Sequence, residues 1–463
     1  MSSITRNLLL VVLLFAVGGP SRVVTAAEGN GSRPPGVRVG AAAAELVADN
    51  SMVIGGSILP KTLTEQEGKL RAVAVVLEKA PFGKLAIVQC DVLMLNRDIL
   101  DPVVLELEKK TGIPAAHILI NCTHTHSAPS TIRVHGYDRD KVFLERVQRG
   151  IVKAVEEAHA NLSKEDCQFL FHLGEENTFG QNSRMLLEDG RIYWSGPRDG
   201  FVRPTGPFDP ELPVLAFRDS NDKLRAAIFN HSTHTMGTRG KNRRSPSVYG
   251  LVAQELETEL GGIFCFLEGA SGSTHNLTLS TEESIRNVKQ AVRDAYSKAR
   301  PRAVDRLAGI RRPFKFKVRH FDEQKEDAAV SDYCRKYLGP YGETVIKVFR
   351  EMRKELAAMQ GEERETWLQA LLIGDVAIVG VPAEYFTKLG LDIKNRSPFR
   401  YTYVAELAND WIGYLPDRDG HVLGGYQTWM GLHSFAEPGT GERVADEIVR
   451  MLQDLRAEAK NAR

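Results

Sequence analysis

An apolar, β-favouring run that ends in two histidines occupies residues 118–129, which read Ile118-Leu119-Ile120-Asn121-Cys122-Thr123-His124-Thr125-His126-Ser127-Ala128-Pro129. Side chains at positions i and i+2 of a strand point to the same face. We therefore expect His124 and His126 to project together from the end of a buried strand. Neutral imidazole is the commonest protein ligand for zinc, and it also carries protons near neutral pH. The stretch predicts a strand that delivers two histidines to a functional site.

A second apolar run also ends in histidine, at residues 226–235, which read Ala226-Ala227-Ile228-Phe229-Asn230-His231-Ser232-Thr233-His234-Thr235. The two stretches together hold four of the twelve histidines of the chain. One histidine at a strand end is usually a hydrogen-bonded, half-buried side chain, and H-x-H is a weak motif by itself. Two such strand ends in one chain favour a metal-assisted active site over that explanation.

The composition is typical of a globular protein and excludes some partners. The chain has 463 residues, 43% apolar and 26% charged, which is enough for one large domain or two ordinary ones. Its formal net charge of +1 gives no electrostatic basis for binding nucleic acid or an anionic membrane. The five cysteines have no CxxC spacing, so neither a zinc ribbon nor a redox pair is indicated, although one disulfide is compatible with the sequence.

The N-terminus has the pattern of a secretory signal peptide. Arg6 precedes an apolar core at residues 8–17, and small residues follow at 24–27. Because this core is too short to span a bilayer comfortably, we expect cleavage after residues 1–27, with a retained anchor as the alternative. The mature chain is then exported, to the periplasm or the medium, without an integral membrane span, and peripheral membrane contact is compatible with it. Residues 28–36 are expected to form a disordered leader.

Strand and helix signals alternate over residues 37–463. Strands are predicted at 71–77, 85–90, 168–173, 212–217, 225–230, 263–267 and 376–381, and helices at 99–109, 142–162, 246–260, 282–299, 341–360 and 441–458. Strands outnumber the helices between them, and no linker divides the chain. We predict an α/β fold, a single large domain with mixed central β-sheets flanked by helices.

Three further segments are dense in functional groups. Residues 268–276 place glycines, hydroxyls and a histidine directly after a strand, where backbone N–H groups can approach a substrate, although a plain Gly/Ser turn is as good an explanation. A strand also leads into Glu384, which is either a helix N-terminal acid or the carboxylate that completes a His/His/carboxylate set with one position open for water. Tyrosines at 414 and 426 lie on Gly- and Pro-rich turns.

These segments occur in an order that resembles a known family. Residues 123–129 resemble the THTHSGP signature of the neutral/alkaline, non-lysosomal ceramidases, which are zinc-dependent amidases. The later histidine strand, the glycine-rich loop, V-P-x-E, N-x-x-x-G-Y and a later G-Y follow in the same order, so the resemblance spans residues 37–426. Ceramidases carry an additional immunoglobulin-like C-terminal domain. We expect this chain to correspond to the catalytic domain alone, as in bacterial ceramidase-like proteins.

The resemblance implies one zinc ion per chain and assigns roles to particular residues. The implied metal ligands are His124, His231, Glu384 and Tyr414, with His234 as the less favoured alternative to His231. The implied catalytic residues are His126, Arg184, His275 and Tyr426. Arg184 is included because Asn182-Ser183-Arg184 matches the family's N-R-S segment in altered order. In these roles Arg184 or Tyr426 stabilises the tetrahedral oxyanion, and His126 or His275 protonates the leaving amine.

One departure bears on the substrate. The ceramidase glycine loop reads G-D-V-S-P-N, whereas this chain has Gly272-Ser273-Thr274-His275-Asn276, so His275 stands where the family has a serine. Three hypotheses follow. The first is an exported zinc hydrolase that cleaves an amide, in an N-acyl lipid such as ceramide or in a related small molecule. The second is a zinc-dependent esterase or acyl hydrolase with a non-ceramide substrate. The third is a catalytically inactive binding protein, which the joint presence of all four implied ligands disfavours. The sequence does not predict an oligomeric state.

Overall fold

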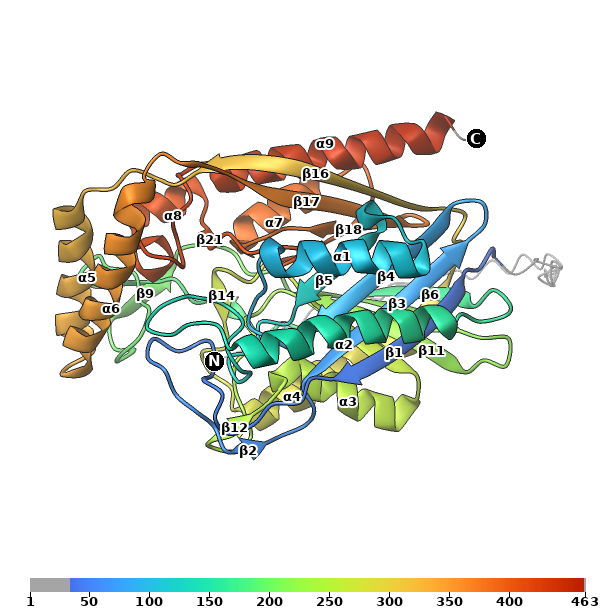
Figure 1. Cartoon of the computed structure of the whole chain (residues 1–463), viewed down its shortest axis with the longest axis horizontal. Helices are drawn as coiled ribbons and strands as arrows, with labels where there is room; N and C mark the ends of the chain where they lie inside the picture. Colours follow the sequence, from blue (N-terminus) through green and yellow to red (C-terminus); the bar gives the residue numbers. More distant parts are fainter. Residues whose placement is uncertain (1–33, 462–463) are drawn as a thin grey trace, which may run out of the picture. The chain divides into compact units, whose positions relative to one another are not determined.

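The computed structural model describes residues 34–461, in which three large sheets carry most of the strands (Figure 1). The first sheet has the order β1 (Arg38–Glu45), β3 (Arg71–Lys79), β4 (Gly83–Cys90), β5 (Ile118–Cys122). The second has the order β13 (Ile263–Glu268), β11 (Leu224–His231), β10 (Glu211–Arg218), β6 (Gln168–Glu175), β15 (Arg300–Arg302). The third has the order β16 (Leu307–Lys317), β17 (Glu363–Ile373), β18 (Val376–Gly380), β20 (Tyr401–Ala405).

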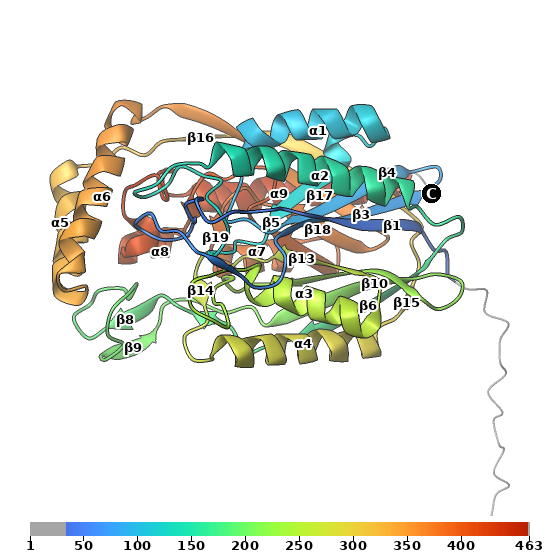
Figure 2. The ribbon, with the colours of Figure 1, turned by 60° about the horizontal axis from the view of Figure 1, so that its bottom comes forward.

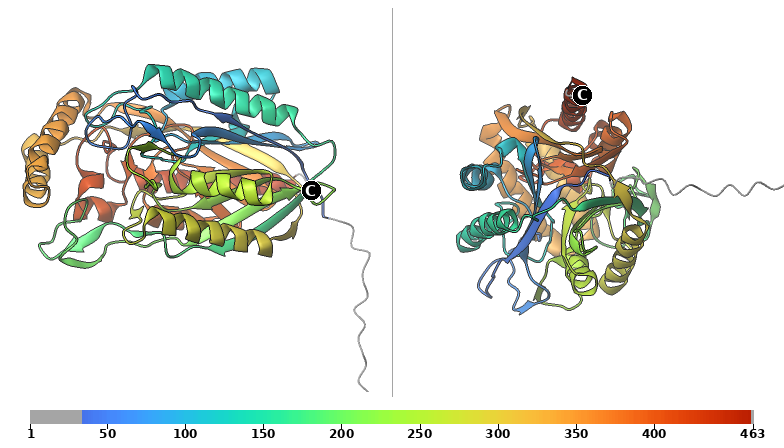
Figure 3. Two further views of the ribbon diagram at one scale, coloured as in Figure 1. Left: turned by 90° about the horizontal axis from the view of Figure 1, so that it is seen from below. Right: turned by 90° about the vertical axis from the view of Figure 1, so that its right-hand side faces the viewer.

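Each sheet is covered on its outer face by helices, as the end-on view shows (Figure 3, right). The covering helices are α1 (Arg97–Thr111) and α2 (Lys141–Ala160) on the first sheet, α3 (Ser247–Leu260) and α4 (Thr281–Lys298) on the second, and α7 (Thr387–Arg396) and α9 (Thr440–Asn461) on the third. The hairpin of α5 (Glu323–Tyr337) and α6 (Tyr341–Leu356) lies at one end (Figure 2, left). The apolar stripe of α4 and a capping box between Ser280 and Glu283 explain why that helix begins where it does.

The inner faces of the three sheets share one apolar core. Along β3, Val73 and Val75 belong to this central core, whereas Ala72 and Ala74 lie on the opposite face, under α2. The same alternation runs along β11 and β18, whose even-numbered residues Ala226, Ile228, Val376 and Ile378 face the centre. Because both faces of each sheet are buried, these strands read in the sequence as nearly continuous apolar runs.

The carboxyl ends of strands from all three sheets meet at one place. Asn121 at the end of β5 accepts a hydrogen bond from the backbone N–H of Glu268 (3.0 Å) and donates one to the carbonyl of Glu406. The backbone N–H of Glu406 in turn donates to the carbonyl of Glu268 (2.9 Å). We call these three residues the three-sheet junction. The loops that follow β5, β13 and β20 therefore start from neighbouring points, the kind of place where α/β proteins bind ligands.

Short elements complete the described residues. The strand pairs are β2 (Glu65–Gln66) with β12 (Arg243–Arg244), β7 (Gln181–Asn182) with β14 (Thr274–His275), β8 (Met185–Leu187) with β9 (Phe201–Pro204), and β19 (Glu384–Tyr385) with β21 (Tyr414–Leu415). Helix α8 spans Arg418–Leu423. None of the helices in the described part of the chain is long and apolar enough to cross a membrane. All five cysteines are buried with free thiols.

The α/β prediction with mixed sheets and outer helices is confirmed, and each predicted strand and helix has a counterpart within a few residues, although the helix expected at 341–360 ends at Leu356. Several elements escaped prediction, among them β1, β17, β20, α5 and α7. The alanine-rich β1 has little strand propensity of its own and is a strand because all eight residues pair with β3. The mostly polar α5 is held by packing against α6. The predicted signal peptide and most of the predicted leader lie outside the described residues, but Pro35 and Gly36 accept hydrogen bonds from Val304 and Lys79.

Candidate metal centre and its pocket

His124 and His126 lie in the loop that follows β5, beyond the last strand residue, Cys122. Strand alternation therefore does not position them. His124 has a left-handed backbone (φ +60°), which turns its side chain back toward the strand ends. The two imidazoles nevertheless reach the same place, with their Nε2 atoms 3.3 Å apart. The expectation that they project to the same place is met by a turn rather than by the i, i+2 geometry of a strand.

The second histidine segment delivers His234, and not His231, to this place. Asn230 and His231 are the last residues of β11 and point to opposite faces of the sheet. Asn230 faces the centre, where its side chain donates to the carbonyls of Leu267 and Val404 (both 2.8 Å). His231 lies on the other face, under α3, with Nε2 3.0 Å from the Glu176 carbonyl and Nδ1 2.6 Å from the Tyr249 hydroxyl.

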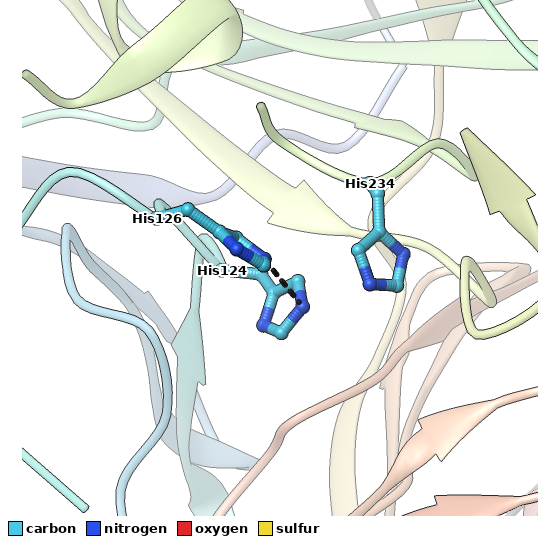
Figure 4. Close-up of side chains that lie close together, drawn as sticks. All are labelled: His124, His126 and His234. Atoms are coloured by element: carbon cyan, nitrogen blue, oxygen red, sulfur yellow. Dashed lines mark hydrogen bonds between the residues drawn. The ribbon is translucent and has the colours of Figure 1, made fainter. Parts of the chain in front are cut away.

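The hydrogen bonds of the three clustered histidines fix their tautomers. His124, His126 and His234 each place Nδ1 against a backbone carbonyl, of Leu93 (3.1 Å), Gly56 (2.9 Å) and Ser271 (2.9 Å) respectively. A carbonyl accepts only, so each Nδ1 carries a proton. Burial lowers the pKa of His126 and His234, so the Nε2 atoms of these two rings keep a free lone pair. One ligand atom from each ring lies within 4.8 Å of the other two (Figure 4). By contrast, both nitrogens of His231 already have partners, so it has no lone pair for an ion.

A carboxylate and a phenol complete the donor set. The parallel pairing of β19 with β21 sets Glu384 beside Tyr414. Glu384 Oε2 lies 3.4 Å from Nε2 of both His124 and His234, and its other oxygen accepts from the Trp411 indole N–H (3.2 Å). The Tyr414 hydroxyl lies 3.3 Å from His234 Nε2. These five groups come from segments that follow strands of all three sheets.

The pKa shifts and the donor atoms of this group together suit the binding of a cation. Burial, reinforced by the neighbouring histidines, lowers the pKa of His126 well below its ordinary value and lowers that of His234. The neutral imidazoles of His126 and His234, with Nδ1–H bound elsewhere, turn an Nε2 lone pair toward the centre of the group, where the Glu384 carboxylate also lies. Histidine nitrogens and a carboxylate can coordinate a divalent ion, and an Nδ1–H bonded to a carbonyl is the usual support of a metal-bound histidine. The buried group is compatible with a metal site.

A cavity of about 400 Å³ opens beside this group. His126, His234 and Tyr414 line it on the side of the candidate metal centre. His275 also lines it, with its ring centroid 4.0 Å from that of His234, and burial lowers the pKa of His275 well below its ordinary value. The position that carries a serine in the resembling family therefore places an imidazole in the pocket.

Tyr426 also lines the cavity, with its ring centroid 5.8 Å from that of Tyr414. Its ring stacks on Trp194 at a centroid distance of 4.6 Å, and its hydroxyl lies 3.1 Å from Nε2 of His135. Burial, with the nearby Glu384, raises the pKa of Tyr426 well above its ordinary value. Sequence reasoning did not single out Trp194 or His135, because neither stands in a segment dense in functional groups.

Arg184 does not line the cavity. It is 2% exposed, and its guanidinium donates to the carbonyls of Gly424 (2.7 Å) and Gly420 (3.1 Å) and to the side chain of Gln427 (2.8 Å). Burial lowers its pKa to about 10. In this position Arg184 holds the segment that carries Tyr426 and Gln427, while the preceding residue, Ser183, lines the pocket.

Comparison with known proteins gives a match in structure only. No family model matches the sequence, and no curated protein matches it. The neutral ceramidase from Pseudomonas aeruginosa superposes with a TM-score of 0.71 at 18% identity, over 92% of this chain and 75% of that one. A ceramidase complexed with C2 gives a TM-score of 0.69 at 19% identity, over 92% and 76%. The predicted ceramidase-like fold is thereby confirmed.

Proposed function

We propose that the protein is a zinc-dependent hydrolase that cleaves an amide in an N-acyl substrate, with His124, His234, Glu384 and Tyr414 as the ligands of one zinc ion. The observation that carries the proposal is the convergence of histidine Nε2 atoms and a carboxylate oxygen from segments that follow strands of three different sheets. The ceramidase-like fold supports the same reaction class. The proposal replaces His231 with His234, because His231 has no free nitrogen.

Zinc at this position would supply Lewis acidity, which polarises a carbonyl and lowers the pKa of a bound water. The chain supplies the rest. His126 is fixed by the Gly56 carbonyl, so its Nε2 can take and return a proton at the edge of the cavity. Tyr426 presents a hydroxyl that can donate to a developing oxyanion. His275 is in reach of a leaving amine on the same side as His234. Trp411 holds the Glu384 carboxylate in one orientation.

An ester or other acyl substrate is the second candidate. The observation that favours it is His275 in place of the family serine, since an ester leaving group needs less help from a precisely placed acid than an amine does. The same donor groups would polarise either carbonyl. A lipid-like acyl chain fits both candidates.

Export is a further part of the proposal. Residues 1–27 have the sequence pattern of a signal peptide, and the rest of the chain provides the catalytic domain. N-terminal sequencing of the protein recovered from the periplasm or the medium of an expressing culture tests it. A first residue close to Ala27 or Glu28 is expected, and an intact Met1 would contradict cleavage.

The decisive experiment measures metal content and hydrolysis in one preparation. Elemental analysis of the purified protein should give about one zinc per chain, and removal with a chelator should abolish hydrolysis until zinc is restored. N-acyl sphingosine, shorter N-acyl amides and matched esters should be tested side by side. Hydrolysis of the short amides alone would exclude ceramide as the substrate and would still support an amide hydrolase. A protein without stoichiometric metal and without turnover would instead be the binding protein considered above.

A further inference from the structure

The wall of the cavity carries one permanent charge, and it is positive. Among the side chains that line the cavity, Arg198 is the only one with a fixed charge, and none is Asp or Glu. Glu384 lies behind the histidines and is only 2% exposed. The remaining polar groups of the wall are hydroxyls, amides and imidazoles. The permanent charge of the wall therefore favours an anion over a cation.

Arg198 is not committed to a carboxylate of the protein. Within residues 34–461 it forms no ion pair, and its only hydrogen bond is from Nη1 to the carbonyl of Leu277. The nearby Arg191 is different, because Asp189 pairs with it at 2.6 Å. The other N–H donors of Arg198 are therefore available, and a guanidinium presents them in the planar arrangement that matches a carboxylate.

The bond to Leu277 also places Arg198 relative to the reaction. Leu277 follows two residues after His275, so the arginine is tied to the loop whose histidine is in reach of the leaving amine in the proposed function. An anion held by Arg198 would thus belong to the amine half of the substrate.

The size of the cavity limits the substrate further. A volume of about 400 Å³ is that of a pocket for one compact molecule, and the stacked rings of Trp194 and Tyr426 give it a flat apolar wall. A short or medium acyl chain fits beside these rings.

We propose, on the basis of the proposed function, that the substrates are N-acyl amino acids and that Arg198 determines this specificity by binding their carboxylate. Hydrolysis adds water across the C–N bond. The acyl carbon gains the hydroxyl, and the nitrogen gains the proton. The products are a carboxylic acid and an amino acid.

The test compares N-hexanoylglycine with N-hexanoylethanolamine, which has a hydroxyl in place of the carboxylate. The zinc-loaded wild-type protein should prefer the glycine conjugate at least about 10-fold in kcat/KM, a typical size for one charged hydrogen-bonded contact. Arg198→Gln should reduce that preference to about 1, mainly through KM, and Arg198→Lys should retain part of it. Arg203→Gln is the matched control, because Arg203 is exposed on β9 and does not line the cavity. A preference that survives Arg198→Gln would overturn the proposal.

A binding measurement separates this proposal from the proposed function. Titration of the same two compounds, followed by tryptophan fluorescence or calorimetry, needs no turnover. The wild-type protein should bind the glycine conjugate more tightly, with an affinity that falls as salt rises, and Arg198→Gln should remove both effects. Selective binding without hydrolysis would contradict only the proposed function. Hydrolysis of both compounds without any preference would contradict the specificity for N-acyl amino acids and the role of Arg198, and would leave the proposed function intact.

Discussion

The ends of β5 and β11 have similar sequences, but they place their histidines differently. Both strands end near an asparagine that ties neighbouring strands together, Asn121 in the three-sheet junction and Asn230 to Leu267 and Val404. Counted from that asparagine, the histidine that reaches the candidate centre comes three residues later in the first segment and four in the second. A histidine directly after Asn230 is still in the strand and must face α3. The difference shows that strand alternation places side chains only as far as the strand extends.

The largest expected effect comes from substituting His234 and His231, the two histidines of the second segment, one at a time and comparing the variants. His234→Ala removes a proposed ligand, so zinc content should fall well below one per chain and kcat/KM should fall by at least about 100-fold. His231→Gln should keep both zinc and most of the activity, because His231 lies on the other face. Elemental analysis and amide hydrolysis check the pair. Loss of zinc only in the His231 variant would reverse the assignment.

The next effect is a pH dependence of stability that arises from two buried acids, Asp91 and Glu268, which contact the two histidine segments. Thr123 donates to Asp91 (3.2 Å), and Thr235 donates to Glu268 (2.7 Å). Burial raises the pKa of Asp91 to about 6, partly offset by Arg71, and raises that of Glu268 well above its ordinary value. The folded state therefore binds these protons more tightly than the unfolded state. The contribution of Asp91 to stability is present below pH 4 and is lost as the pH rises through about 6.

Asp91→Asn tests the direction in which the stability contribution of Asp91 changes with pH. The variant lacks the titrating group, so the difference in unfolding free energy between wild type and variant should shift against the wild type by up to about 3 kcal/mol between pH 4 and pH 7. Urea denaturation at several pH values in this range measures it. A difference that is independent of pH would show that Asp91 is not held protonated by burial.

His231 should matter for stability instead of for metal binding. His231→Ala leaves the Tyr249 hydroxyl and the Glu176 carbonyl without partners in a buried site, which should cost about 1–3 kcal/mol of unfolding free energy. Chemical denaturation of the zinc-free protein isolates this effect from any change in metal binding. A variant as stable as the wild type would mean that water replaces the imidazole.

The smallest effect should come from Tyr249→Phe. Only the hydroxyl is lost, and the His231 Nδ1 lone pair is left unpaired, so about 1 kcal/mol is expected. The effects of Tyr249→Phe and His231→Ala should be less than additive in the double variant, because both remove the same hydrogen bond. Strict additivity would show that the two side chains act independently.

Sequence reasoning predicted the fold class, because buried strands and amphipathic helices can be recognised from their hydrophobic patterns. It also led, through the family resemblance, to His124, Glu384 and Tyr414, which the structure brings together. It favoured His231 over His234 as the second histidine ligand, whereas the structure brings His234 to the candidate centre, because that choice depends on the residue at which β11 ends. It placed Arg184 in the pocket, where the structure has Ser183, because the direction of a side chain in a short loop depends on tertiary contacts such as the carbonyls of α8. Arg198 carried no sequence signal, since one arginine in a loop is unremarkable until its neighbours are known.

Because of the three-sheet junction, the donor groups of the candidate metal centre come together only when all three sheets have folded. The hydrogen bonds of this junction join residues 147 and 285 positions apart, so no short fragment of the chain can assemble the donor groups. Binding energy gained at the centre therefore adds to the cooperative stability of the entire described domain rather than to one loop. Under the proposed function, the zinc ion is bound only after the last sheet has docked, and under the proposed export this step takes place on the far side of the membrane.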